Sequence, residues 1–192
     1  MQQEWIQGQK SRLRREIRDT MVRMSPEERA HSDEALCGVF LALPELCESE
    51  TVLLYYGVGN EVFTKPLLST LLARGKRVLL PRCLPHRQME ARLLCDETEL
   101  VPGVFGIPEP SERCPVVSKE DISLILAPAL CCDREGYRLG KGGGYYDRYL
   151  ADYSGFSVAL CRSILLQDTI PHHGFDQPVS LVLTENGGLS AP

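Results

Sequence analysis

The part of the sequence best suited to chemistry is the run RLGKGGGYYDRYL at residues 138–150. Its glycines would let backbone N–H groups turn inward without obstruction, and a helix that begins just after them would add its positive N-terminal end. That combination suits a phosphate group. Arg138 and Lys141 would add positive charge, and Asp147, one turn into the helix, could hold a magnesium ion that bridges phosphate oxygens.

The residue types of this run leave two interpretations open. A structural loop with two core tyrosines and a capping aspartate fits them as well as a phosphate site does. The run matches neither G-x-x-x-x-G-K-[ST] nor G-x-G-x-x-G, so neither of those nucleotide-binding folds is indicated. Each glycine inside regular structure lowers the stability of the fold by about 0.5–1 kcal/mol, so we expect these glycines to have a function that offsets this cost.

An amphipathic helix is expected near the N-terminus, where apolar residues between Ile6 and Met24 fall at helical spacing. Lys10, Arg14 and Arg18 recur every four residues and would form a basic row on one face of it. The row is either a solvated charged face or a set of cations for an anionic ligand. The segment SPEE at residues 25–28 then predicts a capped second helix that ends near Pro44.

Short apolar runs bounded by turn residues predict the strands of a sheet. Between the first two runs, residues 62–75 predict a helix that ends at Gly75, which gives a right-handed βαβ unit. Residues 89–110 predict only a short hairpin and a loop. We therefore expect residues 1–192 to form one three-layer α/β domain, with helices on both faces of a mostly parallel sheet. The predicted strands are 51–56, 76–81, 122–127, 157–161 and 179–184.

Composition excludes several classes of protein. With a net charge of −5, the chain does not present the basic surface of a nucleic-acid binder. No apolar run approaches the roughly 18 residues of a membrane span, and the first residues lack a secretory signal, so we expect a cytoplasmic protein that binds no membrane. The eight cysteines include no C-x-x-C pair, and we interpret them, Cys131 and Cys132 included, as reduced thiols that mostly pack.

The segment APALCCDREGYRLGKGGGYYDRYL, residues 127–150, resembles the signature of the 5-formyltetrahydrofolate cyclo-ligase family. The resemblance extends along nearly the whole chain. It implies a Rossmann-like fold of the NagB/RpiA/CoA-transferase kind. The other matching segments, in chain order, are K-x-x-L-R from Lys10 to Arg14, NEVFTKPLL, LPR at 80–82, GVFGIPEP at 103–110 and DQPVSLVLTENG.

The resemblance implies an enzyme that uses ATP and Mg²⁺ to convert 5-formyltetrahydrofolate into 5,10-methenyltetrahydrofolate, with ADP and phosphate released. The formyl oxygen would take the γ-phosphoryl group, and N10 would then close the ring. The partners are accordingly ATP and 5-formyltetrahydrofolate, and the chain is expected to be a monomer or a weak homodimer.

The resemblance also assigns residues to ligands. Tyr146, Lys10 and Arg138 are implied in catalysis, and Asp147 is implied as the metal ligand. Glu61 would contact the pterin, although it could instead be an acid at a helix start. The implied ATP contacts are Lys10, Arg14, Arg138, Leu139, Gly140, Lys141, Gly142, Gly143, Gly144, Tyr145 and Tyr146, and the implied substrate contacts are Tyr56, Glu61, Tyr145 and Tyr146.

Two positions depart from the family pattern. Ser180 stands where the family usually has an aspartate that assists metal binding, and Leu165 stands where it often has a glutamine. Asp176 or water could compensate for the missing carboxylate. The departures leave a second hypothesis open, a non-catalytic nucleotide or folate binder, and a third is a sugar-phosphate enzyme whose glycine loop grips a substrate phosphate.

A few other polar residues invite roles that the sequence does not decide. Arg82 could touch phosphate or form an ordinary surface pair, and Thr64 is expected to cap a helix rather than bind a ligand. His172 and His173 have no apparent third partner for a metal ion.

Overall fold

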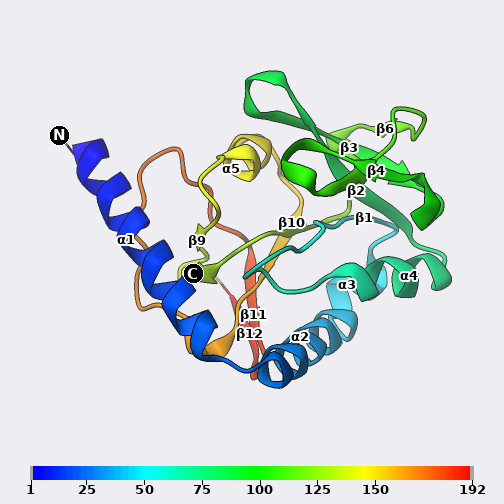
Figure 1. Ribbon diagram of the computed structural model, residues 1–192. Coiled ribbons are helices and arrows are strands. Elements are labelled where there is room, and N and C mark those ends of the chain that lie inside the picture. The colour runs from blue at the N-terminus through cyan, green and yellow to red at the C-terminus, as the bar shows by residue number, and fades with distance from the viewer. Residues whose placement is uncertain (1, 191–192) are drawn as a thin grey trace.

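The computed structural model describes residues 2–190, which form a twisted eight-stranded sheet covered by helices (Figure 1). The five central strands run parallel, whereas β12 pairs antiparallel with β11, β3 with β2 and β6 with β3. The predicted mostly parallel α/β architecture is confirmed. In spatial order the strands are β12 (Gly187–Ser190), β11 (Leu181–Thr184), β10 (Phe156–Leu160), β7 (Leu124–Ala127), β1 (Thr51–Leu53), β2 (Arg77–Leu84), β3 (Gln88–Leu94) and β6 (Val116–Val117).

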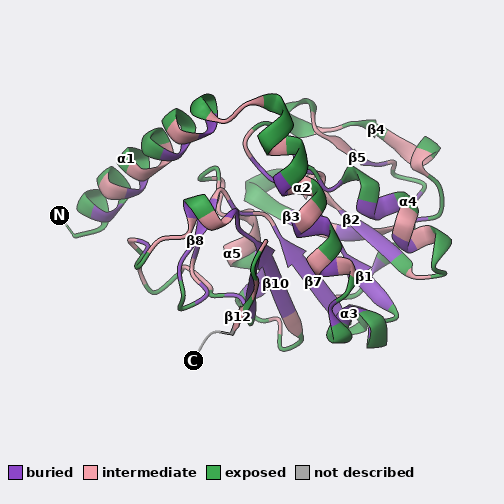
Figure 2. Ribbon diagram, turned by 90° about the horizontal axis from the view of Figure 1, so that it is seen from below, coloured by how far each residue is buried: buried purple, intermediate pink, exposed green. Residues whose placement is uncertain are grey.

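Helices cover both faces of the sheet. On one face α2 (Pro26–Leu41), α3 (Pro44–Glu48) and α4 (Lys65–Ala73) bury a leucine-rich core against the strands, and on the other face α5 (Tyr145–Leu150) packs. Successive strand residues point to opposite faces of the sheet, so Val52 packs in the first core and Leu53 in the second. The central strands are buried along their lengths, whereas α1 is buried only along a stripe (Figure 2).

Helix α1 (Gln2–Arg23) does not cover the sheet directly. Its apolar stripe, with Ile17 and Met21, packs on the small hairpin of β8 (Cys131–Cys132) and β9 (Arg138–Leu139) and on Leu165 and Ile170. The next helix, α2, begins as its sequence predicts, because Ser25 and Glu28 form a reciprocal capping box. In residues 2–190 no helix combines the length and apolar character needed to cross a membrane.

The segment after β2 differs from the prediction. Residues 88–94 form the full strand β3 of the main sheet, and the predicted hairpin is made by β4 (Leu100–Pro102) and β5 (Pro108–Pro110). The sequence of β3, QMEARLL, does alternate, but Met, Glu, Ala, Arg and Leu favour helix over strand, which weakens its strand signal. In the strand Glu90 and Arg92 lie on one face and pair with each other. Short 3-10 turns complete the chain: Pro85–Arg87, Glu97–Glu99, Val104–Gly106, Lys119–Asp121 and Ser163–Leu165.

Three long connections leave the carboxyl ends of neighbouring parallel strands. They follow β1, β7 and β10 and comprise residues 54–64, 128–144 and 161–180. Ligands of open α/β sheets bind outside these strand ends. The glycine run is in the second connection, so it lies where this architecture favours a ligand site.

Candidate active site

The glycine loop needs at least two of its glycines for its backbone. Gly142 has φ +98° and Gly144 has φ +70°, a region that side-chain-bearing residues rarely adopt. A β-carbon on Gly142 would also lie 3.3 Å from the Arg14 guanidinium. Helix α5 starts directly after Gly144 but has only six residues, so side-chain cations must supply most of the positive charge here.

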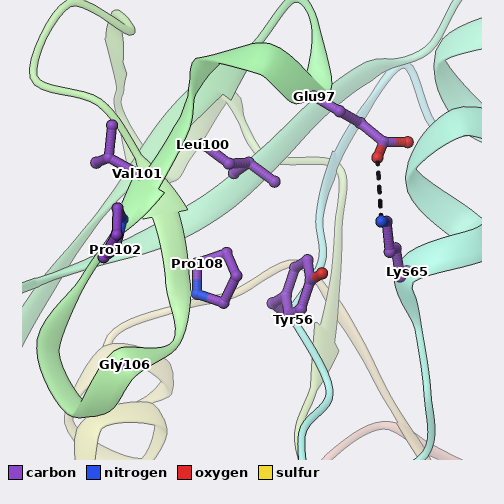
Figure 3. A pocket seen from close by; sticks show the side chains of 8 residues that line it. All are labelled: Tyr56, Lys65, Glu97, Leu100, Val101, Pro102, Gly106 and Pro108. Carbon is purple, nitrogen blue, oxygen red and sulfur yellow. Dashed lines mark ion pairs between the residues drawn. The ribbon is translucent and has the colours of Figure 1, made fainter.

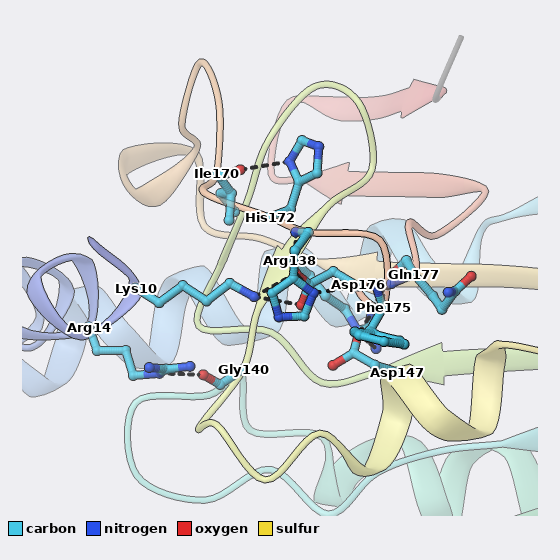
Figure 4. Close-up of polar contacts among 11 residues, drawn as sticks. Lys10, Arg14, Arg138, Gly140, Asp147, Ile170, His172, Phe175, Asp176 and Gln177 are labelled. Carbon is cyan, nitrogen blue, oxygen red and sulfur yellow. Dashed lines mark hydrogen bonds and ion pairs between the residues drawn. The ribbon is translucent and has the colours of Figure 1, made fainter. Parts of the chain in front are cut away.

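Two cations of α1 face this loop (Figure 4). The Arg14 Nε donates to the Gly140 carbonyl at 2.8 Å, and the buried Lys10 ammonium lies 2.5 and 2.7 Å from the two Asp176 oxygens. Arg18, the third member of the basic row, is exposed. The row is therefore divided, and the solvated-face interpretation holds for Arg18 but not for Lys10 and Arg14.

The carboxylate of Asp176 is strongly held. Burial alone would raise its pKa, but hydrogen bonds from Lys10 and the His173 N–H outweigh burial, and the pKa lies below its ordinary value. Because Asp176 already neutralises Lys10, it is a poor replacement for the aspartate that the family pattern has at position 180.

Arg138 and Asp147 connect the glycine loop to the segment before β11. The buried Arg138 lies 3.2 Å from an Asp147 oxygen and donates to the Gln177 carbonyl at 2.6 Å. The Gln177 N–H donates to the same Asp147 oxygen at 3.3 Å. The partners of Asp147 thus lie outside the first turn of α5, which argues against the capping interpretation of this aspartate.

Metal binding would depend on few protein ligands. Among residues 2–190 no cluster of three or more His, Cys, Asp or Glu side chains could hold a metal ion. Mg²⁺ commonly keeps several waters and is bound through one or two carboxylates plus phosphate oxygens, so Asp147 fits a phosphate-borne ion.

The two residues that depart from the family pattern have structural partners of their own. Ser180 exchanges hydrogen bonds with Ser157 at the amino ends of β10 and β11, and Leu165 is buried under α1.

Tyr145 and Tyr146 follow the glycines and are half-buried against the core. The Tyr146 hydroxyl is buried and has no hydrogen-bond partner in the described part of the chain. Its pKa is raised, first by burial and then by the negative charge of Glu61. Buried hydroxyls normally find a partner, so this one is oriented for a group that a ligand could bring.

Glu61 belongs to the connection after β1 and is buried. Its Oε2 accepts hydrogen bonds from the Val58 N–H at 3.1 Å and from the Lys141 ammonium at 2.8 Å. Helix α4 starts only at Lys65, so Glu61 is not the helix-start acid of the alternative interpretation. Thr64 occupies the cap position, but its hydroxyl bonds to Tyr55 and Gly57 rather than capping α4.

Tyr56, the other implied substrate contact, lines a cavity of about 350 Å³ between α4 and the β4–β5 hairpin (Figure 3).

The remaining candidates have structural contacts instead. Arg82 forms a surface pair with Glu112 at 3.1 Å, and His172 stacks on Tyr137 with ring centroids 3.6 Å apart. Cys131 and Cys132 are completely buried, and burial helps to raise both thiol pKa values. They pack, as the sequence predicts.

One polar network near the site was not anticipated. Arg162, buried just after β10, donates to Asp33 of α2 at 2.7 Å, and the same Asp33 oxygen accepts from the Phe63 N–H at 3.1 Å. Asp33 thereby fixes the connection that carries Glu61. The only sequence signal was an arginine at the end of an apolar strand; the partner, 129 residues away, gave none.

Comparison with known proteins gives a consistent result. The family model described as the 5-formyltetrahydrofolate cyclo-ligase family matches residues 6–185. A 5-formyltetrahydrofolate cyclo-ligase from Mycolicibacterium smegmatis is 35% identical, over 95% of this chain and 96% of that relative.

The solved structures that are similar to this chain include two 5,10-methenyltetrahydrofolate synthetases. The NMR structure of 5,10-methenyltetrahydrofolate synthetase from Aquifex aeolicus has 32% identity and a TM-score of 0.84, and the match covers 95% of this chain and 92% of the other. A 5,10-methenyltetrahydrofolate synthetase from Mycoplasma pneumoniae has 22% identity and a TM-score of 0.71, covering 90% and 96%, and this second likeness supports the fold alone.

Proposed function

This chain belongs to the 5-formyltetrahydrofolate cyclo-ligase family, and we propose that it is an ATP- and magnesium-dependent ligase that closes the 5,10-methenyl ring of tetrahydrofolate. The formyl oxygen on N5 attacks the γ-phosphorus of ATP and ADP leaves. N10 then attacks the activated formyl carbon and loses its proton, and cleavage of the carbon–oxygen bond releases phosphate. Phosphorylation is needed because the formyl oxygen is otherwise a poor leaving group.

The cations around the glycine loop would bind the triphosphate. Arg14 already contacts the loop at Gly140, and this approach of α1 to the glycines is the observation that carries the proposal. Lys10 and Arg138 now pair with Asp176 and Asp147 and would turn part of their charge to phosphate oxygens. Phosphoryl transfer is catalysed mainly by such positioning and charge stabilisation.

The pterin would lie against Glu61 and the two tyrosines. A buried carboxylate can accept hydrogen bonds from the pterin N–H groups, and the Tyr146 hydroxyl has no competing partner among residues 2–190. That hydroxyl would donate to the formyl group and hold its oxygen toward the γ-phosphate. Tyr146 would therefore act where the nucleotide and the folate meet.

Asp147 is the residue that would hold magnesium, in company with phosphate oxygens and water. When bound with ATP, the ion neutralises charge on the phosphates. Asp147→Asn should lower turnover most severely at low magnesium concentration, and excess magnesium should restore part of it. A defect of the same size at every magnesium concentration would assign Asp147 to the loop structure alone.

The test of the function is spectroscopic. The purified chain, 5-formyltetrahydrofolate, ATP and magnesium should give the absorbance of the methenyl product, with one ADP formed per product. Omission of ATP is the control. No product over a range of pH and metal concentrations would overturn the proposed activity.

Ser180 bonds to Ser157 at the amino ends of β10 and β11, whereas the proposed site is built from the connections that leave the carboxyl ends, so the lack of a carboxylate at Ser180 does not favour a non-catalytic binder. Such a binder is the alternative outcome of the test. It would bind nucleotide or folate in calorimetry without turnover. The family match leaves the sugar-phosphate interpretation without support.

A further inference from the structure

The residues that line the cavity beside Tyr56 come from outside the glycine loop. The cavity is lined by Lys65, the first residue of α4, and by the β4–β5 hairpin with the turns on either side of it (Figure 3). Its volume of about 350 Å³ is in the range of small-molecule sites. Tyr56 is one of the proposed folate contacts, so the cavity begins where the pterin is proposed to bind. The hairpin residues that line it are Leu100, Val101, Pro102, Gly106 and Pro108.

The walls and the end of the cavity differ in character. Leu100 and Pro108 present apolar surface next to Tyr56, whereas the ion pair of Lys65 and Glu97 closes one end (Figure 3). A ligand that fits must therefore be apolar in its middle and charged at its end.

The ion pair at that end is weak. Lys65 Nζ and Glu97 Oε2 are 4.0 Å apart, and the two side chains are 48% and 34% exposed. Exposed pairs of this kind contribute about 0–1 kcal/mol, so the Lys65 ammonium can exchange Glu97 for another carboxylate at little cost.

The start of α4 strengthens the preference for an anion. Its first turn carries no acidic residue, and the hydroxyl of Thr64 makes no capping hydrogen bond. The positive end of the helix dipole and the Lys65 ammonium thus act together at the cavity.

We propose that this cavity takes the aminobenzoyl-glutamate part of the folate. The benzoyl ring lies between Tyr56, Leu100 and Pro108, and a carboxylate of the first glutamyl residue binds Lys65 in place of Glu97. This inference rests on the proposed function, since it extends the same folate from its pterin to its tail. It makes Lys65 and Glu97 opposing determinants of substrate affinity, one attracting the tail and the other competing with it.

The two partners of the ion pair provide the test, because their removal should have opposite effects. Lys65→Met should raise KM for 5-formyltetrahydrofolate about three- to tenfold, and Glu97→Gln should lower it about two- to threefold, on the scale of 1.4 kcal/mol per factor of ten. Both variants should keep kcat and the KM for ATP. If the pair only supports the fold, both substitutions weaken binding or neither does, and the proposal fails.

A substrate without the glutamyl residue separates binding of the glutamyl carboxylate from indirect effects. With 5-formyltetrahydropteroate, which lacks glutamate, wild-type and Lys65→Met proteins should have the same KM. Equal effects on both substrates would overturn the assignment. Lys119→Met and Asp152→Asn, which break another ion pair near the amino ends of the strands, are controls that should change neither KM.

Calorimetry without ATP makes the inference independent of turnover. The wild-type chain should bind 5-formyltetrahydrofolate more tightly than 5-formyltetrahydropteroate, and Lys65→Met should remove the difference. If the chain binds in this pattern but forms no product, the proposed activity fails while the tail site stands. Equal binding of the two compounds by the wild type refutes the tail site.

Discussion

The ammonium of Lys141 lies 2.8 Å from Oε2 of Glu61, although the two residues are 80 positions apart in the sequence. Lys141 belongs to the loop proposed to bind ATP, and Glu61 is the proposed pterin contact. Glu61 is buried, whereas the Lys141 side chain is 44% exposed. The pair therefore joins the two halves of the proposed site and offsets the charge of Glu61 in the free chain.

Glu61→Gln should weaken folate binding much more than ATP binding. The amide keeps the shape of the side chain but removes the charged acceptor, and a hydrogen bond to a charged group contributes about 1.5–3 kcal/mol. We expect KM for 5-formyltetrahydrofolate to rise roughly tenfold or more. Initial rates with each substrate varied in turn measure the split, and equal increases in both KM values would contradict the role given to Glu61.

Tyr146→Phe should separate stability from activity. The hydroxyl is buried and finds no hydrogen-bond partner within the described residues, so its removal should leave the free energy of unfolding unchanged or slightly higher. Turnover should fall by roughly 10²–10³-fold if the hydroxyl orients the formyl group, which is the usual effect of losing such a donor. Urea unfolding and kcat are the two measurements, and full activity in the variant would exclude this role.

The local parts of the fold could be predicted from the sequence. The Ser25 capping box and the buried runs at β1 and β7 are encoded by neighbouring residues, and the structure contains them. Strand β3 could not be predicted with the same certainty, because its residues, Met, Glu, Ala, Arg and Leu among them, favour helix over strand. Of the proposed site, residue types alone left the glycine loop as either a structural loop or a phosphate site, and only the family resemblance favoured the second interpretation.

Long-range partners could not be predicted. Nothing near Lys10 in the sequence indicates that its ammonium is bonded to Asp176, 166 residues away, or that Arg18 in the same row is exposed. The helical spacing defines a face but not what that face meets. The tertiary packing of α1 on the β8–β9 hairpin decides it.

Arg14→Ala should lower ATP affinity, and Arg18→Ala is its matched control. Both residues belong to one row of α1, but only Arg14 contacts the glycine loop. Loss of a charge-assisted phosphate contact costs about 1.5–3 kcal/mol of binding free energy. Substitution of an exposed residue that makes no such contact changes it by only about a few tenths of a kcal/mol. Titration calorimetry should therefore show an affinity for ATP that is roughly 10- to 150-fold weaker in Arg14→Ala and unchanged in Arg18→Ala. Equal effects of the two substitutions would exclude Arg14 from the phosphate site.

The cysteines should divide by accessibility when the folded chain meets a thiol reagent at neutral pH. Cys47 and Cys95 are exposed and should react quickly. Cys131 and Cys132 are buried with raised pKa values, and burial with a hydrogen bond to Glu109 raises the pKa of Cys83 to about 12. Few thiolates form at these three positions. Labelling of the buried Cys131 and Cys132 should therefore require unfolding, labelling of the half-buried Cys83 should be slow, and rapid labelling of Cys131 would contradict the packing interpretation.

The pair of Lys10 and Asp176 should make stability depend on pH in the acid range. The folded-state pKa of Asp176 is lowered, because the Lys10 and His173 hydrogen bonds outweigh burial. A carboxyl group with a lowered pKa contributes stability above its unfolded value of about 3.9, and this contribution is lost as the pH falls through the folded value. Asp176→Asn should therefore be less stable than the wild type at pH 7, and the difference should shrink below about pH 4. Urea unfolding of both proteins between pH 3 and pH 7 measures this, and a difference that does not change with pH would mean that the ionised carboxylate adds nothing to the amide's hydrogen bonds.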